Sequence, residues 1–367
     1  MIRICHIISG DLWAGAEVMI YHLLEGLQEF EDISNRVILL NEGILSARIR
    51  GLGIRVHIVN ERSNSLVNIL RIFKEILREE KPHIVHSHGY KVNILSYLIS
   101  KSIKPVKLVA TQHGMPKVPE KRFNPGYQLK SRLNLFLLSR YFHRVVGVSE
   151  EIKEAFVKLY RFPENKTWVI HNGVEIPHLM ADRVNNDYFV IGSSGRLFPV
   201  KNYELMIEIA RAISQKTDRV YFELAGNGPE MERLKALASE YRLGDVFSFK
   251  GHLDDISPFY QGLDVYLNTS IHEGIPMSVL EAMAHKLPVI APRIGGLPEI
   301  IDDGVQGYLL KERDPAAYAG KCIFLYENKS LRQRMSEAAR EKVEQMFSVK
   351  KMAQNYSHLY IDLAKGW

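Results

Sequence analysis

The sequence has few cysteines and no long apolar run. Only Cys5 and Cys322 occur among the 367 residues, and they lie far apart along the chain, so neither a disulfide framework nor a cysteine metal site is available. No apolar run approaches the roughly 18 residues that span a bilayer. The short apolar stretch after Arg3 stops at Asp11, too early for a signal-peptide core. These absences predict a soluble globular protein of the reducing cytoplasm.

Two patterns that would point to a cofactor are also weak or missing. No Gly-x-Gly-x-x-Gly segment follows a strand-like run, which argues against a hydride-transferring dehydrogenase. The pair His86 and His88, in Val-His-Ser-His-Gly, resembles a metal-binding pair. We expect these two side chains to point to opposite faces at a strand end, with no nearby carboxylate or cysteine to complete a site. The sequence therefore predicts no bound metal and no cofactor.

Positive charge is concentrated in the first half of the chain. Residues 1–180 carry 25 Lys and Arg against 17 Asp and Glu, and the remainder carries 23 against 25. The basic half should meet an anionic partner, and with no recognisable nucleic-acid module we favour a lipid headgroup surface or a phosphorylated acceptor over nucleic acid. Residues 121–144 mix Lys and Arg with Phe, Leu and Tyr, which suits an anionic membrane face. A packed helix with one solvated side explains that stretch equally well.

Apolar β-branched runs alternate with helical segments from the first residue onward, which predicts an α/β fold with parallel sheets. The expected strands of the first half cover residues 2–8, 35–40, 54–59, 83–87, 107–111, 144–148 and 167–171.

The chain is long enough for two domains of ordinary size. Residues 175–187 show no periodic spacing of apolar residues and are rich in Pro, Asn and Asp, a composition typical of a linker. A second series of βα units follows, so we expect Rossmann-like domains at 1–178 and 187–349 that face a common cleft. The sequence leaves open whether a C-terminal helix at about 350–367 packs back onto the first domain.

The segment Glu-Gly-Ile-Pro-Met-Ser-Val-Leu-Glu places Glu273 and Glu281 on either side of an expected helix start. Pro276 suits the first helical position, since a helix start leaves its missing N–H unused. The free amides of that first turn form a seat for phosphate. Glu281 lies five residues further on, about 7.5 Å along the axis, where it could accept both ribose hydroxyls of a nucleotide. Glu273 would then lie beside a sugar carried on the same diphosphate.

Cations and glycines elsewhere support that interpretation. Arg196 and Lys201 lie in a loop after an expected strand, where they could neutralise a diphosphate without a metal. Gly10 and Gly15 lie at the end of the first strand, where a helix start could receive the same phosphates.

Together these segments resemble the retaining glycosyltransferases of family 4, which have the GT-B fold. The resemblance rests on Glu-x7-Glu at 273–281 and on further motifs in the family's order. These are GAE at 15–17, HSHG at 86–89, TQHG at 111–114, VGVSE at 146–150, HNGV at 171–174, GRL at 195–197 with Lys201, LAGNGPE at 224–230 and GGLPEIIDDGVQGYLL at 295–310. The match spans nearly the whole chain.

The resemblance implies a role for each matching residue. Arg196 and Lys201 would hold the donor diphosphate, Glu281 the ribose, and Glu273 and His113 the transferred sugar. The first domain would bind the acceptor and the second the donor. The turn that caps the distal phosphate would comprise Gly274, Ile275, Pro276, Met277 and Ser278. The remaining donor contacts would come from Gly15, Gly226, Asn227, Gly228, His252 and Leu253. The first loop has Ala14-Gly15 where two glycines are usual, which weakens the case for its phosphate contact.

The function implied by this resemblance is transfer of a hexose or N-acetylhexosamine from a nucleoside diphosphate sugar, most commonly UDP-linked, with retained stereochemistry. The acceptor would be a glycan or a lipid-linked molecule in cell-surface polysaccharide or glycolipid synthesis. No Asp-x-Asp occurs, which argues against a metal-dependent transferase of the other common fold. A sugar-nucleotide epimerase and a non-catalytic sugar-nucleotide-binding subunit remain as alternatives. We expect a cytoplasmic protein and leave peripheral membrane contact open.

Overall fold

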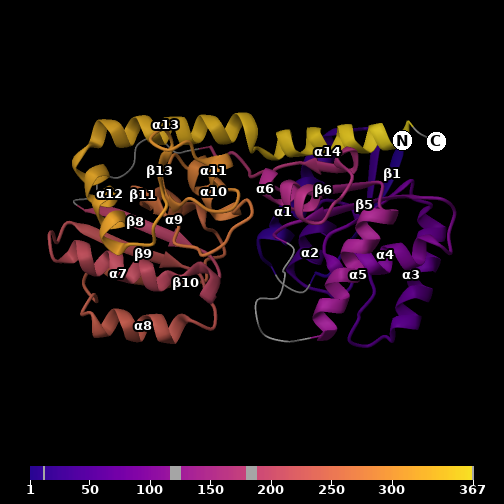
Figure 1. Ribbon diagram of the computed structural model, residues 1–367, viewed down its shortest axis with the longest axis horizontal. Coiled ribbons are helices and arrows are strands. Elements are labelled where there is room, and N and C mark those ends of the chain that lie inside the picture. Colours follow the sequence, from indigo (N-terminus) through magenta and orange to yellow (C-terminus); the bar gives the residue numbers. More distant parts are fainter. Residues whose placement is uncertain (11–12, 116–124, 179–187, 366–367) are drawn as a thin grey trace. The chain divides into compact units, whose positions relative to one another are not determined.

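The computed structural model of the chain describes residues 1–10, 13–115, 125–178 and 188–365. It divides into two compact units, each built around one parallel sheet (Figure 1). The first unit comprises Met1–Gly173 together with Val349–Trp367, and the second comprises Val174–Ser348. In the described residues no helix combines the length and the apolar character that crossing a membrane requires.

The boundaries of the units differ slightly from those expected. The first unit ends at Gly173 and not at 178. The reason is that Val174 donates its N–H to the carbonyl oxygen of Phe347 over 2.9 Å and pairs with Ser348, both in the second unit. The second boundary, after Ser348, lies one residue before the expected 349. Residues 179–187 of the expected linker lie outside the described part.

The first sheet has seven strands in the order β3-β2-β1-β4-β5-β6-β7, and each neighbouring pair is parallel. The strands are β1 (Ile2–Ile8), β2 (Ile33–Leu39), β3 (Arg55–Ile58), β4 (Ile84–Ser87), β5 (Lys107–Gln112), β6 (Arg144–Gly147) and β7 (Thr167–Val169). The seven strands expected from the sequence are therefore confirmed, and their ends differ from the expected ones by at most two residues. Both faces of a parallel sheet are covered by helices, which is why these strands read as continuous apolar runs.

Helices cover the first sheet. They are α1 (Gly15–Gly26), α2 (Ile44–Gly51), α3 (Leu66–Glu80), α4 (Tyr90–Ser100), α5 (Pro125–Tyr141), α6 (Glu150–Glu154) and α14 (Val349–Ala364). Short 3₁₀ helices lie at Leu27–Glu29 and Glu164–Lys166, and a π-helical segment at Ala155–Leu159 continues α6.

The C-terminal helix α14 packs on the first unit, which answers the question that the sequence left open. Gly26 of α1 makes close approach possible, because a Cβ there would lie 2.8 Å from the Cβ of Ala353 and 2.9 Å from a methyl group of Val349. Two buried hydroxyls of α14 reach the sheet: Tyr360 lies 2.7 Å from Nδ1 of His86, and Tyr356 bonds Thr111 of β5.

The second sheet has six parallel strands in the order β10-β9-β8-β11-β12-β13. The strands are β8 (Phe189–Ser194), β9 (Val220–Ala225), β10 (Phe247–Gly251), β11 (Val265–Leu267), β12 (Val289–Pro292) and β13 (Gly307–Leu310). Its helices are α7 (Tyr203–Ser214), α8 (Met231–Glu240), α9 (Ser257–Gly262), α10 (Met277–Ala284), α11 (Leu297–Ile300), α12 (Pro315–Glu327) and α13 (Lys329–Met346), with a short turn at Pro199–Lys201.

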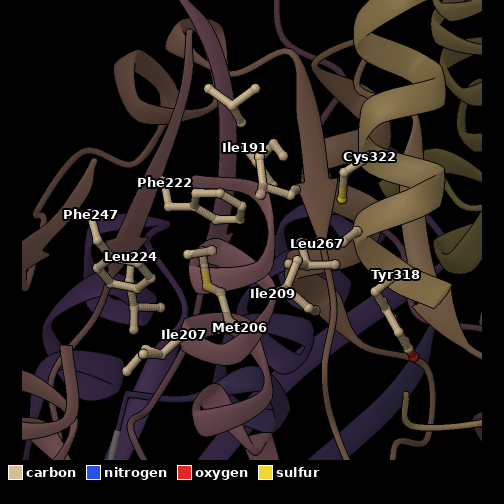
Figure 2. Close-up of a cluster of buried hydrophobic side chains, with 14 of the residues drawn as sticks. Ile191, Met206, Ile207, Ile209, Phe222, Leu224, Phe247, Leu267, Tyr318 and Cys322 are labelled. Atoms are coloured by element: carbon tan, nitrogen blue, oxygen red, sulfur yellow. The ribbon is translucent and has the colours of Figure 1, made fainter. Parts of the chain in front are cut away.

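The core of the second unit is apolar. Figure 2 shows Ile191 of β8, Phe222 of β9 and Met206 of α7 grouped with Leu267 of β11, and each is at most 1% exposed. Burying one such side chain contributes about 1.5–3 kcal/mol. Cys322 of α12 belongs to the same core, and burial raises the pKa of its thiol to about 12, so it packs as a small apolar residue.

Candidate functional site

The expected donor residues of the second unit gather where parallel strands end. Gly195 follows β8, Gly226 follows β9, and Gly251 ends β10. These three positions are close together, because the N–H of Gly226 donates to the carbonyl oxygen of Gly251 over 2.7 Å and that of Gly195 donates to Ala225 over 3.0 Å. Carboxyl ends of parallel strands share one edge of a sheet, where open α/β sheets bind ligands.

Glycine is required where these loops touch. A Cβ on Gly226 would lie 1.9 Å from the carbonyl oxygen of Gly195, and one on Gly228 would lie 2.6 Å from that of Leu197. Asn227 closes the turn by accepting from the N–H of Gly228 over 2.7 Å. The structure therefore brings the Gly-Asn-Gly turn directly against the loop that carries Arg196.

Lys201 and Glu273 form an ion pair, although they are 72 residues apart in sequence. Nζ of Lys201 lies 2.6 Å from Oε1 of Glu273. The same carboxylate oxygen accepts from Ser270 over 2.5 Å and from Asn268 over 3.4 Å, and Glu273 is 9% exposed. A carboxylate this buried is held in one orientation by its donors. Arg196 stacks its guanidinium on the ring of Phe198, 4.8 Å from the ring centre.

The turn that we expect to hold phosphate, residues 274–278, lies at the start of α10 (Met277–Ala284). Pro276 is the N-cap residue in extended conformation and Met277 is the first helical residue, so the expectation that Pro276 begins the helix was wrong by one position. The reason is that the backbone turns into the helix only after Pro276, whose ψ is 118°. Among the described residues no side chain caps this helix start, and a ligand or water can accept from the first N–H groups of such a helix. Gly296 packs beneath, with its N–H 3.1 Å from the carbonyl oxygen of Gly274.

Glu281 lies on α10, half-buried, and contacts a residue that sequence analysis missed. Oε2 of Glu281 is 2.8 Å from the hydroxyl of Tyr260, which in turn is 2.8 Å from the hydroxyl of Ser194 at the end of β8. Tyr260 lies in the short helix α9 and is fully buried. No sequence signal identifies it, because its contacts come from segments that packing brings together.

The residues expected near the base lie at the end of β10. The side chain of His252 is exposed and lies 3.6 Å from Asp254, and Leu253 is half-buried. Gly251 has a positive φ of 69°, which lets the chain turn away from the sheet toward these two residues.

Gly15 and His113 belong to the first unit, whereas the other expected site residues belong to the second. Gly15 is the first residue of α1 and follows Ala14 in extended conformation. His113 follows β5; its two ring nitrogens are buried and have no hydrogen-bond partner among the described residues. Burial lowers the pKa of His113 to about 4, so the ring is neutral near pH 7.

His86 and His88 do not point to opposite faces, and that expectation was wrong. Their ring centres are 4.1 Å apart, and His6 of β1 joins them, with Nδ1 3.2 Å from Nε2 of His88. The physical reason is that residues two apart on a strand share a face. Burial lowers the pKa of all three rings, which stay neutral.

These three histidines come close enough to be considered as metal ligands. However, His6 uses its other nitrogen on Asn35, and both nitrogens of His86 lie within 2.8 Å of the hydroxyls of Tyr360 and Thr111. A metal would have to displace these bonds. The donor set therefore fits a hydrogen-bonded histidine cluster better than a metal centre.

Comparison with known proteins covers both units. Residues 180–342 match the family model described as Glycosyl transferases group 1, and residues 13–177 match the model described as Glycosyltransferase Family 4. The chain is 27% identical over 312 residues to the Escherichia coli UDP-Gal:alpha-D-GlcNAc-diphosphoundecaprenol alpha-1,3-galactosyltransferase, a match covering 81% of this chain and 79% of that protein. It is 24% identical over 305 residues to N-acetyl-alpha-D-glucosaminyl L-malate synthase of Bacillus anthracis, covering 79% and 77% of the two chains.

Among solved structures, that of Anabaena Alr3699/HepE in complex with UDP matches with a TM-score of 0.86 at 20% identity, over 98% of this chain and 100% of that one. Two Rossmann-like halves with parallel sheets define the class as an α/β protein of the GT-B fold. The chain belongs to glycosyltransferase family 4.

Proposed function

We propose that the protein is a retaining, metal-independent glycosyltransferase that moves a hexose or N-acetylhexosamine from a UDP-sugar to a glycan or lipid-linked acceptor. The acceptor would serve cell-surface polysaccharide or glycolipid synthesis. The observation that carries the proposal is the contact of Lys201 with the buried Glu273, at the strand ends that also carry the start of α10. The relatives support the substrate classes: HepE was solved with UDP, and the name of the E. coli protein specifies a UDP-Gal donor and a diphosphoundecaprenol acceptor.

In this proposal the second unit stabilises the leaving diphosphate. Arg196, Lys201 and the backbone N–H groups of the 274–278 turn, in which Pro276 has none, supply positive charge and N–H donors where negative charge grows. Glu281 accepts the ribose hydroxyls, and the residues at 226–228 and 251–253 line the base. Glu273, held by Lys201 and Ser270, accepts from the hydroxyls of the transferred sugar.

In this proposal the first unit binds the acceptor and contributes Gly15 and His113 to the binding of the donor. Gly15, at the start of α1, offers backbone amides to the phosphates. His113 donates a hydrogen bond to the transferred sugar, and its buried, neutral ring suits a donor that orients the sugar without adding charge.

The reaction breaks the bond between the anomeric carbon and the diphosphate oxygen, and both electrons leave with the oxygen. The acceptor hydroxyl oxygen forms the new bond to the anomeric carbon from the same face. Its proton passes to the departing phosphate oxygen, so no side chain has to act as a covalent nucleophile. Two cations and helix amides balance the charge of the product diphosphate, which is why we propose that no metal is needed.

Thermal stabilisation by a panel of nucleotide sugars tests the donor. A ligand at 100 times its dissociation constant stabilises the folded chain by about 2.7 kcal/mol, so UDP-sugars should raise the melting temperature more than GDP- or ADP-sugars. NMR of the product then tests the stereochemistry, and the assay is repeated with a chelator. Inverted product, or activity lost in chelator and restored by a divalent ion, would contradict the proposal.

The alternatives give different products. A sugar-nucleotide epimerase changes the sugar without an acceptor, whereas a transferase releases only slow hydrolysis products. A non-catalytic subunit binds the nucleotide sugar and yields neither product.

We also propose that the protein is cytoplasmic and associates peripherally with an anionic membrane through α5. Leu129, Leu133 and Phe136 are 70%, 42% and 57% exposed, and their spacing places them on one face of the helix. Asn134, Leu137 and Leu138 are buried, so α5 is also a packed helix.

The charge near α5 suits an anionic lipid surface. Residues 81–149 contain twelve Lys and Arg but a single acidic residue, Glu120. Exposed apolar side chains set among cations favour a bilayer, because a polyanion such as nucleic acid would leave the apolar groups without a partner.

Flotation with vesicles tests this surface. The chain should float with vesicles of phosphatidylglycerol and phosphatidylcholine at low salt, and much less with phosphatidylcholine alone. Leu129→Ser with Phe136→Ser should reduce flotation, whereas Leu159→Ser, 63% exposed in the same unit, should not. Failure of the unchanged protein to float at low salt would refute membrane contact without touching the donor site.

A further inference from the structure

A buried tyrosine connects the carboxylate of Glu281 to the end of strand β8. The hydroxyl of Tyr260 lies 2.8 Å from Oε2 of Glu281 and 2.8 Å from Oγ of Ser194. Ser194 is the last residue of β8 and stands two residues before Arg196. Tyr260 therefore joins the two parts of the second unit to which we assign the ribose and the diphosphate.

The directions of these hydrogen bonds follow from chemistry. A carboxylate only accepts, so Tyr260 donates its single proton to Glu281 and is left to accept from the hydroxyl of Ser194. The hydroxyl of Tyr260 is also 3.4 Å from the carbonyl oxygen of Ser278, a longer and weaker alternative to its bond with Glu281. The N–H of Ser194 donates to the hydroxyl of Tyr266 over 3.2 Å, and that hydroxyl donates to the carbonyl oxygen of Ser194 over 3.1 Å.

This chain of bonds is shielded from water. Tyr260 and Tyr266 are fully buried and Ser194 is 6% exposed. Linked hydrogen bonds in a low-dielectric interior reinforce one another. Burial and the charge of Glu281 raise the pKa of Tyr260, so its hydroxyl keeps its proton and remains a donor.

We propose that Tyr260 is a positioning residue that orients the carboxylate of Glu281 toward the ribose hydroxyls of the donor nucleotide. The inference rests on the proposed donor site. Tyr260 itself does not touch the nucleotide in this proposal. It acts by occupying one oxygen of Glu281 and by anchoring that oxygen to β8, so that the carboxylate meets the ribose in one orientation.

Binding of UDP and of 2′,3′-dideoxy-UDP to the full-length chain tests the inference by calorimetry. The ratio of the two dissociation constants reports how well the ribose hydroxyls are recognised. Because both ligands are measured on the same variant, a general loss of stability does not change this ratio. The variants are Glu281→Ala, Tyr260→Phe, Ser194→Ala and the control Tyr318→Phe.

Tyr318 is a matched control because it is a fully buried tyrosine of the same unit whose hydroxyl has no hydrogen-bond partner among the described residues. We expect the unchanged chain to prefer UDP by about tenfold or more, as a hydrogen bond to a charged group allows. Glu281→Ala should remove this preference. Tyr260→Phe should remove most of it, Ser194→Ala a smaller part, and Tyr318→Phe none.

One result would contradict the ribose site at Glu281, and another would contradict only the positioning role of Tyr260. If the unchanged chain binds both ligands equally, the ribose site at Glu281 is wrong. If the unchanged chain discriminates and Glu281→Ala does not, while Tyr260→Phe discriminates as well as the unchanged chain, the donor site stands and the positioning role of Tyr260 is overturned.

Discussion

The two units of this chain share a sheet topology and differ in which polar groups they bury and where these groups lie. In each, the first strand is central, with two strands added on one side and the rest on the other. The first unit buries three neutral imidazoles, His6, His86 and His88, and that of His86 contacts the hydroxyl of Tyr360 on α14. The second has a core of apolar side chains and places the contact of Lys201 with Glu273 at its strand ends.

The same sheet topology therefore accommodates two different arrangements of polar groups. Buried imidazoles with lowered pKa values carry no charge near pH 7 and shape the first unit through hydrogen bonds. The second unit instead holds the ion pair of Lys201 with Glu273 at its strand ends. Changes of pH and of single residues that act on one unit more than on the other would test this difference.

Acid should destabilise the first unit before the second. Burial lowers the pKa of His6 and of His113 from 6.5 to about 4, so the unfolded chain binds protons below about pH 6.5 and the folded chain only below about pH 4. The contribution of each such neutral histidine to the free energy of unfolding is therefore fully present above pH 6.5. It falls as the pH drops toward 4, by about 3 kcal/mol for each histidine.

Hydrogen exchange at pH 7 and pH 5 would measure this effect. Peptides from β4 and β5 should lose protection at pH 5 more than peptides from β11 and β12. Equal losses in both sheets would show that the histidine cluster does not set the acid response.

Removing the charges of the second unit should affect activity more than stability. We expect Lys201→Ala, Glu273→Ala and Arg196→Ala each to reduce transfer by about a hundredfold or more, on the scale of one lost transition-state donor. Steady-state kinetics with a UDP-sugar would measure the loss, and circular dichroism would check folding. Rates equal to those of the unchanged chain in all three variants would remove the site assignment.

Crowding the contact of α1 with α14 should weaken the first unit. Gly26→Ala adds a Cβ 2.8 Å from that of Ala353, and overpacking costs about 1–3 kcal/mol. Gly51→Ala is the control, since a Cβ there meets nothing within 4 Å. Urea unfolding should separate the two variants, and equal midpoints would show that α14 has room to move.

Deleting the hydroxyl of Tyr360 should have the smallest effect. Tyr360→Phe removes a partner 2.7 Å from Nδ1 of His86, and one lost hydrogen bond of this kind costs about 1 kcal/mol. The variant should unfold at slightly lower urea concentration, and the exchange of β4 should rise before that of β11. An unchanged midpoint would mean that His86 finds another partner.

Much of the fold could be predicted, because the pattern of apolar runs is local. The first-half strands appear within two residues of their expected bounds. No strand was expected at β13. It begins at Gly307, which packing requires to be glycine, because a Cβ there would lie 1.8 Å from the carbonyl oxygen of Val289. The faces of His86 and His88 were misjudged, although the two-residue period of a strand could have corrected them.

The candidate site could be predicted only as a set of residues. The motifs identified Lys201 and Glu273 separately, and no spacing indicated that they meet at 2.6 Å across 72 positions. Tyr260 lay in no motif, because a tyrosine becomes a polar link only when packing places its hydroxyl between Glu281 and Ser194.

The sequence by itself determined the alternation of strands and helices, the glycine-lined loops and the family, since each depends on residues that are neighbours along the chain. Only the tertiary structure decided that α14 returns to the first unit, that three histidines cluster, and which groups bond at the strand ends. Those contacts join distant segments, and their geometry follows from how whole helices and sheets pack, which no short stretch of sequence specifies.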